Sequence, residues 1–260
     1  MMPISQTVAI DCFPESAERY ADGWAVVAID VIRATTVAVT AVAMGRRCFP
    51  VPSLQAAMRT ARRLENPLLG GEVGGVKPEC FEINNSPSEV AARTDLERPL
   101  VLVSTSGTQL IDKARACAAL YLACFRNYGS AARYLAGYYP RVAVIGAGSR
   151  GEFREEDQMC CAWVAQALME EGYSAQDERT VEIVERWRGA PPSACAHGKS
   201  AAYLRRSGQT NDLDFALTHV NDLEAAFILR GEEIVMVSSA DYDAVLHSWG
   251  RAEGERALVA

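Results

Sequence analysis

The sequence predicts an α/β protein with three layers, in which helices cover both faces of a largely parallel or mixed sheet. Apolar segments that suit buried strands alternate with helical patterns over the first 170 of the 260 residues, as is typical of such a sheet. Residues 25–29 are apolar throughout, as expected of a strand covered on both faces. Glycine, hydroxyl and acidic residues follow several of these segments directly, so polar loops are expected at the strand ends.

The individual elements follow from local patterns. Apolar runs bounded by turn residues predict strands at 8–12, 25–29, 48–51, 68–72, 100–104, 119–124, 142–145, 225–229 and 234–237. Helical spacing and end signals predict helices at 35–44, 54–64, 109–116, 130–135, 158–171, 178–187, 200–206 and 213–219, with one more starting after Ser86. We expect one folded unit; the alternative is two subdomains, about 1–140 and 141–260, with the site between them.

Composition disfavours several kinds of partner. The 26 basic and 33 acidic residues give a net charge of −7, which argues against nucleic acid or an anionic membrane surface. The sequence shows no membrane-spanning run and no targeting segment, so we expect a cytoplasmic protein. Eight cysteines lack a metal spacing and His197, His219 and His247 lie far apart, which argues against zinc. A homodimer is left open.

An acid and an arginine follow the strand at 25–29. Asp30 comes directly after it and Arg33 three residues later, at the end of a strand where open α/β sheets bind their ligands. We expect Asp30 at an exposed strand end. The alternative is that Asp30 caps a helix and pairs with Arg33.

Two further loops carry polar residues. Glu72 lies in a glycine-rich loop after the strand at 68–72, and Asn85 and Ser86 precede a helix for which Ser86 is a credible N-cap. A capping box alone would also explain the second loop. The hydroxyl and glycine residues Thr105, Ser106, Gly107 and Thr108 link a strand to a helix, which suits a phosphate cradle, although an ordinary turn uses similar residues.

The glycine-rich turn at 146–151 resembles a dinucleotide-binding fingerprint. That fingerprint requires an acidic residue at the end of a second strand, about 20 residues on, and none is found there. The turn is followed by Glu152, Glu155, Glu156 and Asp157. These acids favour either the start of a helix or a hard-cation site such as magnesium.

Five motifs together resemble the 2-phosphosulfolactate phosphatases of coenzyme M biosynthesis and their relatives. The motifs are IDVIRATT (29–36), GGEVGG (70–75), NNSPSE (84–89), TSGT (105–108) and AGSRGEFREED (147–157), in the family's order and spacing. The segment 200–214 matches more loosely. Relatives often have a cysteine where this chain has Gly146, so a catalytic cysteine there is excluded.

The resemblance implies a magnesium-dependent phosphatase that acts on the phosphate ester of a 2-hydroxy acid, with the identity of the acid portion left open. Asp30, Arg33 and Glu72 are then expected to be catalytic, and Asp30, Glu156 and Asp157 to hold magnesium. The residues expected to bind the substrate or its phosphate are Thr35, Asn85, Ser86, Thr105, Ser106, Gly107 and Thr108. Two alternatives remain: a dinucleotide-binding oxidoreductase using Gly146 to Gly151, and a non-catalytic binder of a small phosphorylated acid.

Overall fold

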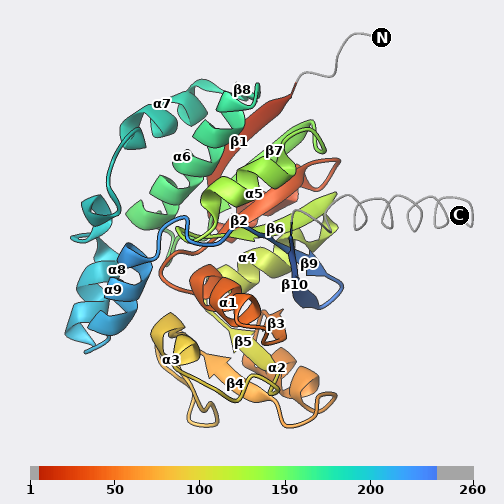
Figure 1. Ribbon diagram of the computed structural model, residues 1–260, viewed down its shortest axis with the longest axis vertical. Coiled ribbons are helices and arrows are strands. Elements are labelled where there is room, and N and C mark those ends of the chain that lie inside the picture. The colour runs from red at the N-terminus through yellow and green to blue at the C-terminus, as the bar shows by residue number, and fades with distance from the viewer. Residues whose placement is uncertain (1–5, 239–260) are drawn as a thin grey trace, which may run out of the picture.

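A single ten-stranded sheet with helices on both faces forms the protein (Figure 1). The computed structural model describes residues 6–238. The strand order is β4-β5-β3-β10-β9-β6-β2-β7-β1-β8. The predicted α/β class, with a mixed and mostly parallel sheet between helical layers, is confirmed.

The sheet consists of two parallel groups of strands that an antiparallel hairpin joins. The smaller group is β4 (Leu68–Gly71), β5 (Leu100–Val103) and β3 (Cys48–Val51). The larger group is β6 (Ala119–Ala123), β2 (Ala25–Ile29), β7 (Arg141–Gly146), β1 (Thr7–Cys12) and β8 (Ser174–Ala175). The hairpin of β9 (Ala226–Arg230) and β10 (Glu233–Val237) pairs antiparallel with β6 on one side and β3 on the other.

Helices cover both faces of this sheet. On one face lie α1 (Ala34–Ala43), which links β2 to β3, and α4 (Gly107–Lys113), which precedes β6; α3 (Pro87–Ala91) packs against α1. On the other face lie α5 (Tyr128–Leu135), α6 (Glu155–Glu170) and α7 (Glu178–Trp187) over the larger group, and α2 (Leu54–Ala61) over the smaller one. Strand β2 shows why both faces are apolar: Val26 and Ala28 face α1 and α4, whereas Val27 and Ile29 face the opposite layer.

A pair of helices, here called the helical arm, precedes the β9–β10 hairpin in the chain. It consists of α8 (Lys199–Arg206) and α9 (Thr210–Thr218), which Figure 1 shows as a blue pair at one side of the molecule. The sheet crosses the predicted boundary near residue 140, because β7 lies between β1 and β2. Within residues 6–238 we find no helix with the length and apolar character that crossing a membrane requires.

Most element boundaries agree with the sequence prediction, and α6 differs in a way that matters for the site. This helix begins at Glu155 instead of residue 158, so that Glu155, Glu156 and Asp157 form its first turn. Helix α2 ends at Ala61, three residues early. The prediction missed β8 and the 3-10 helices η1 (Pro14–Tyr20) and η3 (Pro192–Cys195). It included the 3-10 helix η2 (Ala114–Ala116) in the helix predicted at 109–116.

Candidate active site

A cavity of about 390 Å³ lies where the carboxyl ends of both parallel groups face the helical arm. Asp30 follows β2 and Glu72 follows β4, while Ser104 and Thr105 follow β5. The fourth contribution comes from Asp157, in the first turn of the helix that follows β7. All of these residues line the cavity, so loops from both parallel groups supply its walls.

Asp30 is buried in the cavity wall with 6% of its surface exposed, which corrects the expectation of an exposed strand end. The start of α4 covers it so closely that a side chain at Gly107 would collide with its carboxylate. The Thr35 hydroxyl holds its backbone, accepting from the Asp30 amide at 2.9 Å and donating to the Asp30 carbonyl at 2.8 Å. Burial, with the negative charges of Glu72 and Glu156, raises the pKa of Asp30 to about 7, against a backbone hydrogen bond at Ala34 and the charge of Arg33.

Asp157 is fixed beside Asp30 by backbone hydrogen bonds. Its Oδ1 accepts from the Val31 amide at 2.8 Å and its Oδ2 accepts from the Gly148 amide at 3.2 Å. Burial and the nearby charges of Asp30 and Glu156 nevertheless raise its pKa well above the ordinary range. The cavity thus contains carboxyl groups whose negative charges disfavour one another.

Glu72 ties two loops together. Its Oε1 accepts from the Thr105 amide at 2.6 Å, and its Oε2 accepts from the Thr105 hydroxyl at 2.7 Å and from the Gly75 amide at 2.5 Å. The Gly107 amide donates to the Ser104 hydroxyl at 3.3 Å. Two of the amides expected to cradle a phosphate therefore already have partners inside the protein.

The predicted phosphate-binding residues divide into two groups. Asn85, Thr105 and Ser106 line the cavity, and the buried Asn85 Oδ1 atom has no hydrogen-bond partner among residues 6–238. The others do not line it and instead hold backbone or a neighbouring side chain; they are Thr35, Ser86, Gly107 and Thr108. Their predicted contact with substrate stays a prediction, and the structure gives them positions one layer behind the cavity.

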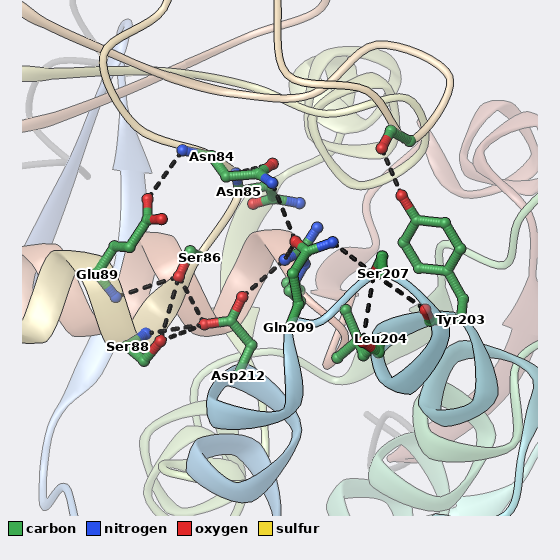
Figure 2. A network of polar contacts seen from close by, with 12 residues as sticks. Asn84, Asn85, Ser86, Ser88, Glu89, Tyr203, Leu204, Ser207, Gln209 and Asp212 are labelled. Carbon is green, nitrogen blue, oxygen red and sulfur yellow. Dashed lines mark hydrogen bonds and ion pairs between the residues drawn. The ribbon is translucent and has the colours of Figure 1, made fainter.

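Arg33 lines the cavity but does not form an ion pair with Asp30, so the alternative of a local Asp30–Arg33 pair is wrong. Its Nη1 atom bonds to Asp212 Oδ2 at 2.7 Å and also to the Gln209 side chain, both on the helical arm. Asp212 is in turn fixed by Ser86 and Ser88 (Figure 2). The sequence could not indicate this pairing, because the partners are 179 positions apart and belong to the loosely matching segment.

Four further basic residues line the cavity opening: Arg150, Arg154, Lys199 and Arg206. Lys199 and Arg154 both contact Glu152 Oε2, at 2.7 and 3.3 Å. Sequence reasoning assigned no role to these cations. Arg150 and Arg154 do lie within the motif at 147–157, and basic residues inside a functional motif were the available signal.

The turn at 146–151 does not provide a dinucleotide site of the usual kind. Helix α6 begins only at Glu155, and three carboxylates occupy its first turn, where they would repel a pyrophosphate. The Asp157 side chain also packs within 3.2 Å of the place that a Cβ of Gly146 would take. The geometry therefore disfavours the oxidoreductase alternative.

Glu156 lies behind the cavity and is almost fully buried. In the described part of the chain neither carboxylate oxygen has a hydrogen-bond partner, although the nearby Ser200 side chain favours the charged form of Glu156. Burial raises the pKa of Glu156. A neighbouring positive charge would stabilise such a buried carboxylate, and no described residue forms an ion pair with Glu156.

The acids do not form a complete metal site on their own. Within residues 6–238, no three histidine, cysteine, aspartate or glutamate side chains are grouped as a metal ion requires. Asp30 and Asp157 could supply part of a magnesium coordination shell. Magnesium is usually bound by one or two carboxylates, and water and substrate phosphate fill its other positions. His197 and His219 do not line the cavity, and His247 lies outside the described residues.

The fold and the cavity define an α/β protein whose site suits a small anionic compound. The family profile described as 2-phosphosulpholactate phosphatase matches residues 12–230. The chain therefore belongs to the 2-phosphosulfolactate phosphatase family, a family of phosphoric monoester hydrolases, and the resemblance drawn from its motifs is confirmed.

Individual relatives support this assignment. A protein of Carboxydothermus hydrogenoformans described as a probable 2-phosphosulfolactate phosphatase is 31% identical over 181 residues, or 69% of this chain and 75% of the relative. A protein of Clostridium perfringens with the same description is 27% identical over 92% of this chain and 98% of the relative. A third, from Pseudothermotoga lettingae, is 36% identical over 55% of this chain, and the match spans 61% of that relative's length.

Proposed function

We propose that the chain is a magnesium-dependent phosphatase that hydrolyses the phosphate ester of a 2-hydroxy acid, such as 2-phosphosulfolactate to sulfolactate and phosphate. The observation that carries this proposal is one cavity that is lined both by buried carboxyl groups and by several cationic side chains. The carboxyl groups suit a divalent cation, and the cations suit the anionic groups of such a substrate. Family membership supports the same reaction.

Magnesium would be held by Asp30 and Asp157, with Glu156 behind them. Burial raises the pKa of all three carboxyl groups, and a bound cation would favour their charged forms. When bound, magnesium would polarise a phosphoryl oxygen and lower the pKa of a water molecule. This assignment leaves most of the coordination shell to water and substrate.

The remaining residues would bind and orient the ester. Arg33 would offer positive charge to the phosphoryl group, and Arg150 and Arg206, which also line the cavity, would offer positive charge to the acid group. Asn85 can use its unpartnered Oδ1 to accept from a substrate hydroxyl or a bound water. Hydrolysis breaks the phosphorus–oxygen ester bond, with water supplying an oxygen to phosphate and a proton to the leaving hydroxyl.

We further propose a cytoplasmic location. All eight cysteines are free, and six of them are buried. Free thiols in this number suit a reducing compartment.

Phosphate release from a panel of 2-phospho-hydroxy acids tests the proposal. The panel includes 2-phosphosulfolactate, and each compound is assayed with magnesium and after exhaustive EDTA treatment. We expect release that depends on magnesium and is restored by adding it back. Substrate binding without release would support a non-catalytic binder instead, and full activity in EDTA would exclude the metal assignment.

A further inference from the structure

One buried polar cluster joins the helical arm to Arg33 and to the segment that begins α3. Figure 2 shows its contacts with that segment. Asp212, in the first turn of α9, points toward the segment that begins α3. Its Oδ1 accepts from the hydroxyls of Ser86 and Ser88 at 2.6 and 2.5 Å, and from the Ser88 amide at 3.2 Å. Its Oδ2 faces Arg33 Nη1 at 2.7 Å. The position of this carboxylate is therefore determined on both sides.

Arg33 and Asp212 form a charge pair away from water. Their side chains are only 4% and 3% exposed. A pair of this kind adds little stability by itself, but removing one partner leaves an uncompensated buried charge. Such pairs are best explained by the geometry that they fix, and here one member of the pair lines the cavity.

Only one nitrogen of Arg33 is used by the cluster. Nη1 binds Asp212 and the Gln209 side chain, and Gln209 also accepts from Asn84 Nδ2 at 2.9 Å (Figure 2). In the described part of the chain, Nε and Nη2 of Arg33 make no hydrogen bond. A guanidinium held through one nitrogen keeps further donors for an anion in the cavity.

Arg33 is also close enough to Asp30 for its positive charge to lower the pKa of that carboxyl group. Without Asp212, the guanidinium would be attracted to the buried carboxylates of Asp30 and Asp157. The guanidinium would then neutralise the carboxylate charge that the proposed cation requires. It would also no longer present its free N–H donors to a phosphoryl group. Asp212 prevents this by holding Arg33 through its Nη1 atom.

We propose that Asp212 is a positioning residue, which holds the Arg33 guanidinium for the phosphoryl group of the substrate and away from the metal-binding carboxylates. The inference rests on the proposed function, because it assumes that a phosphate ester enters this cavity. Asp212 itself does not line the cavity, so it acts through Arg33.

A double-mutant cycle tests this role. The wild type is compared with Asp212→Asn, Arg33→Gln and the double variant, using the dissociation constant for inorganic phosphate from calorimetry with magnesium present, together with KM and kcat. We expect each single variant to weaken phosphate binding by about tenfold or more, as for a charge-assisted hydrogen bond. In the Arg33→Gln background, adding Asp212→Asn should change binding by less than about twofold, because the two residues act as one unit.

The matched control is Asp95→Asn. Asp95 pairs at 2.9 Å with Arg46, whose side chain is fully buried, and neither residue lines the cavity. This variant should lower the melting temperature and leave phosphate affinity unchanged. If Asp212→Asn does not fold, Asp212→Glu keeps the charge and displaces it by one methylene group, and it should weaken phosphate binding as well.

The outcomes separate the inference from the proposed function. Additive losses in the cycle, or a folded Asp212 variant with wild-type phosphate affinity, would overturn the positioning role even if the enzyme hydrolyses its ester. Coupled losses of phosphate binding in a protein that hydrolyses no ester would support the positioning role and refute the phosphatase. A wild type that neither binds phosphate nor hydrolyses any ester would overturn both.

Discussion

Asp30 combines two opposing effects in one residue. Its burial penalises the charged carboxylate and raises its pKa to about 7, while its place in the cavity wall makes that charge useful to a cation. In the folded, metal-free protein the carboxyl group therefore retains its proton over a range in which the unfolded chain has already lost it. The consequence is a stability that depends on pH and on metal.

The first prediction is that Asp30→Asn stabilises the metal-free protein and abolishes turnover. Between pH 3.8 and about 7 the folded wild type binds more protons than the unfolded chain, so its stability falls as the pH rises. The variant lacks this loss, and its advantage should grow across that range to at most roughly 4 kcal/mol. Melting temperatures in EDTA at several pH values measure the effect.

Magnesium provides the control for this prediction. It should raise the melting temperature of the wild type and leave that of Asp30→Asn nearly unchanged, since the variant lacks the carboxylate charge. A variant that is less stable than the wild type at every pH, or one that retains magnesium-stimulated turnover, would contradict the assignment.

At the residue scale, the sequence predicted several residues that line the cavity, but it did not predict the contacts that these residues make. The positions of Asp30, Glu72 and Thr105 at strand ends follow from local pattern, and all three line the cavity. The partner of Arg33 does not follow, because it is chosen by the packing of α9 against the start of α3. Burial of Asp30 was also missed, since it arises from the close approach of Gly107 far along the chain.

At the element scale, the start of α6 sorts four neighbouring acids into different environments. Glu152 lies before the helix and is exposed, and Glu155 is half-buried in its first turn. Glu156 and Asp157 point inward and are buried. The helix dipole would stabilise all three helical acids to a similar degree, whereas their burial differs.

The second prediction concerns single neutral substitutions of these four acids. Asp157→Asn should stop turnover because Asp157 lines the cavity, and Glu156→Gln should raise the magnesium requirement because the charge of Glu156 acts on Asp30 and Asp157. Glu155→Gln should cost about 0.3–1 kcal/mol of stability with little effect on rate. Glu152→Gln should chiefly change KM, since Glu152 contacts Lys199 and Arg154 at the cavity opening.

Melting temperature, KM and the magnesium dependence of the rate, measured for each variant, distinguish these effects. Equal small losses of stability in all four, with unchanged rates, would mean that the acids serve only the helix start.

The long elements were predictable because their signals are local and repeated. Strand β3 and helix α7 have the bounds expected from apolar runs and helical spacing. The two-residue strand β8 and the four-residue 3-10 helix η3 carry too few residues to show a period. The early start of α6 also depends on tertiary contacts, because Asp157 bonds to the backbone of two other loops.

At the scale of the whole molecule, the cavity depends on how two parallel groups of strands are held apart. Glu72 and Thr105 follow the smaller group, whereas Asp30 follows the larger one. The β9–β10 hairpin lies between the groups in the sheet, and its junction with β3 is a single residue pair, Ile234 with Cys48. The sequence indicated these late strands but gave no sign of where they insert, since strand order is decided by packing.

The third prediction is that Ile234→Ala weakens both the fold and the site, although Ile234 does not line the cavity. Ile234 is 1% exposed, so its truncation should cost about 2–5 kcal/mol, which lowers the melting temperature by roughly 5–15 °C. KM should rise as well, because the junction sets the spacing between the two walls. Met236→Ala is the matched control, since Met236 lies on the same strand with 47% of its surface exposed, and it should leave both quantities near wild type. A lower melting temperature with an unchanged KM would show that the connections through α1 and α4 fix the spacing without the hairpin.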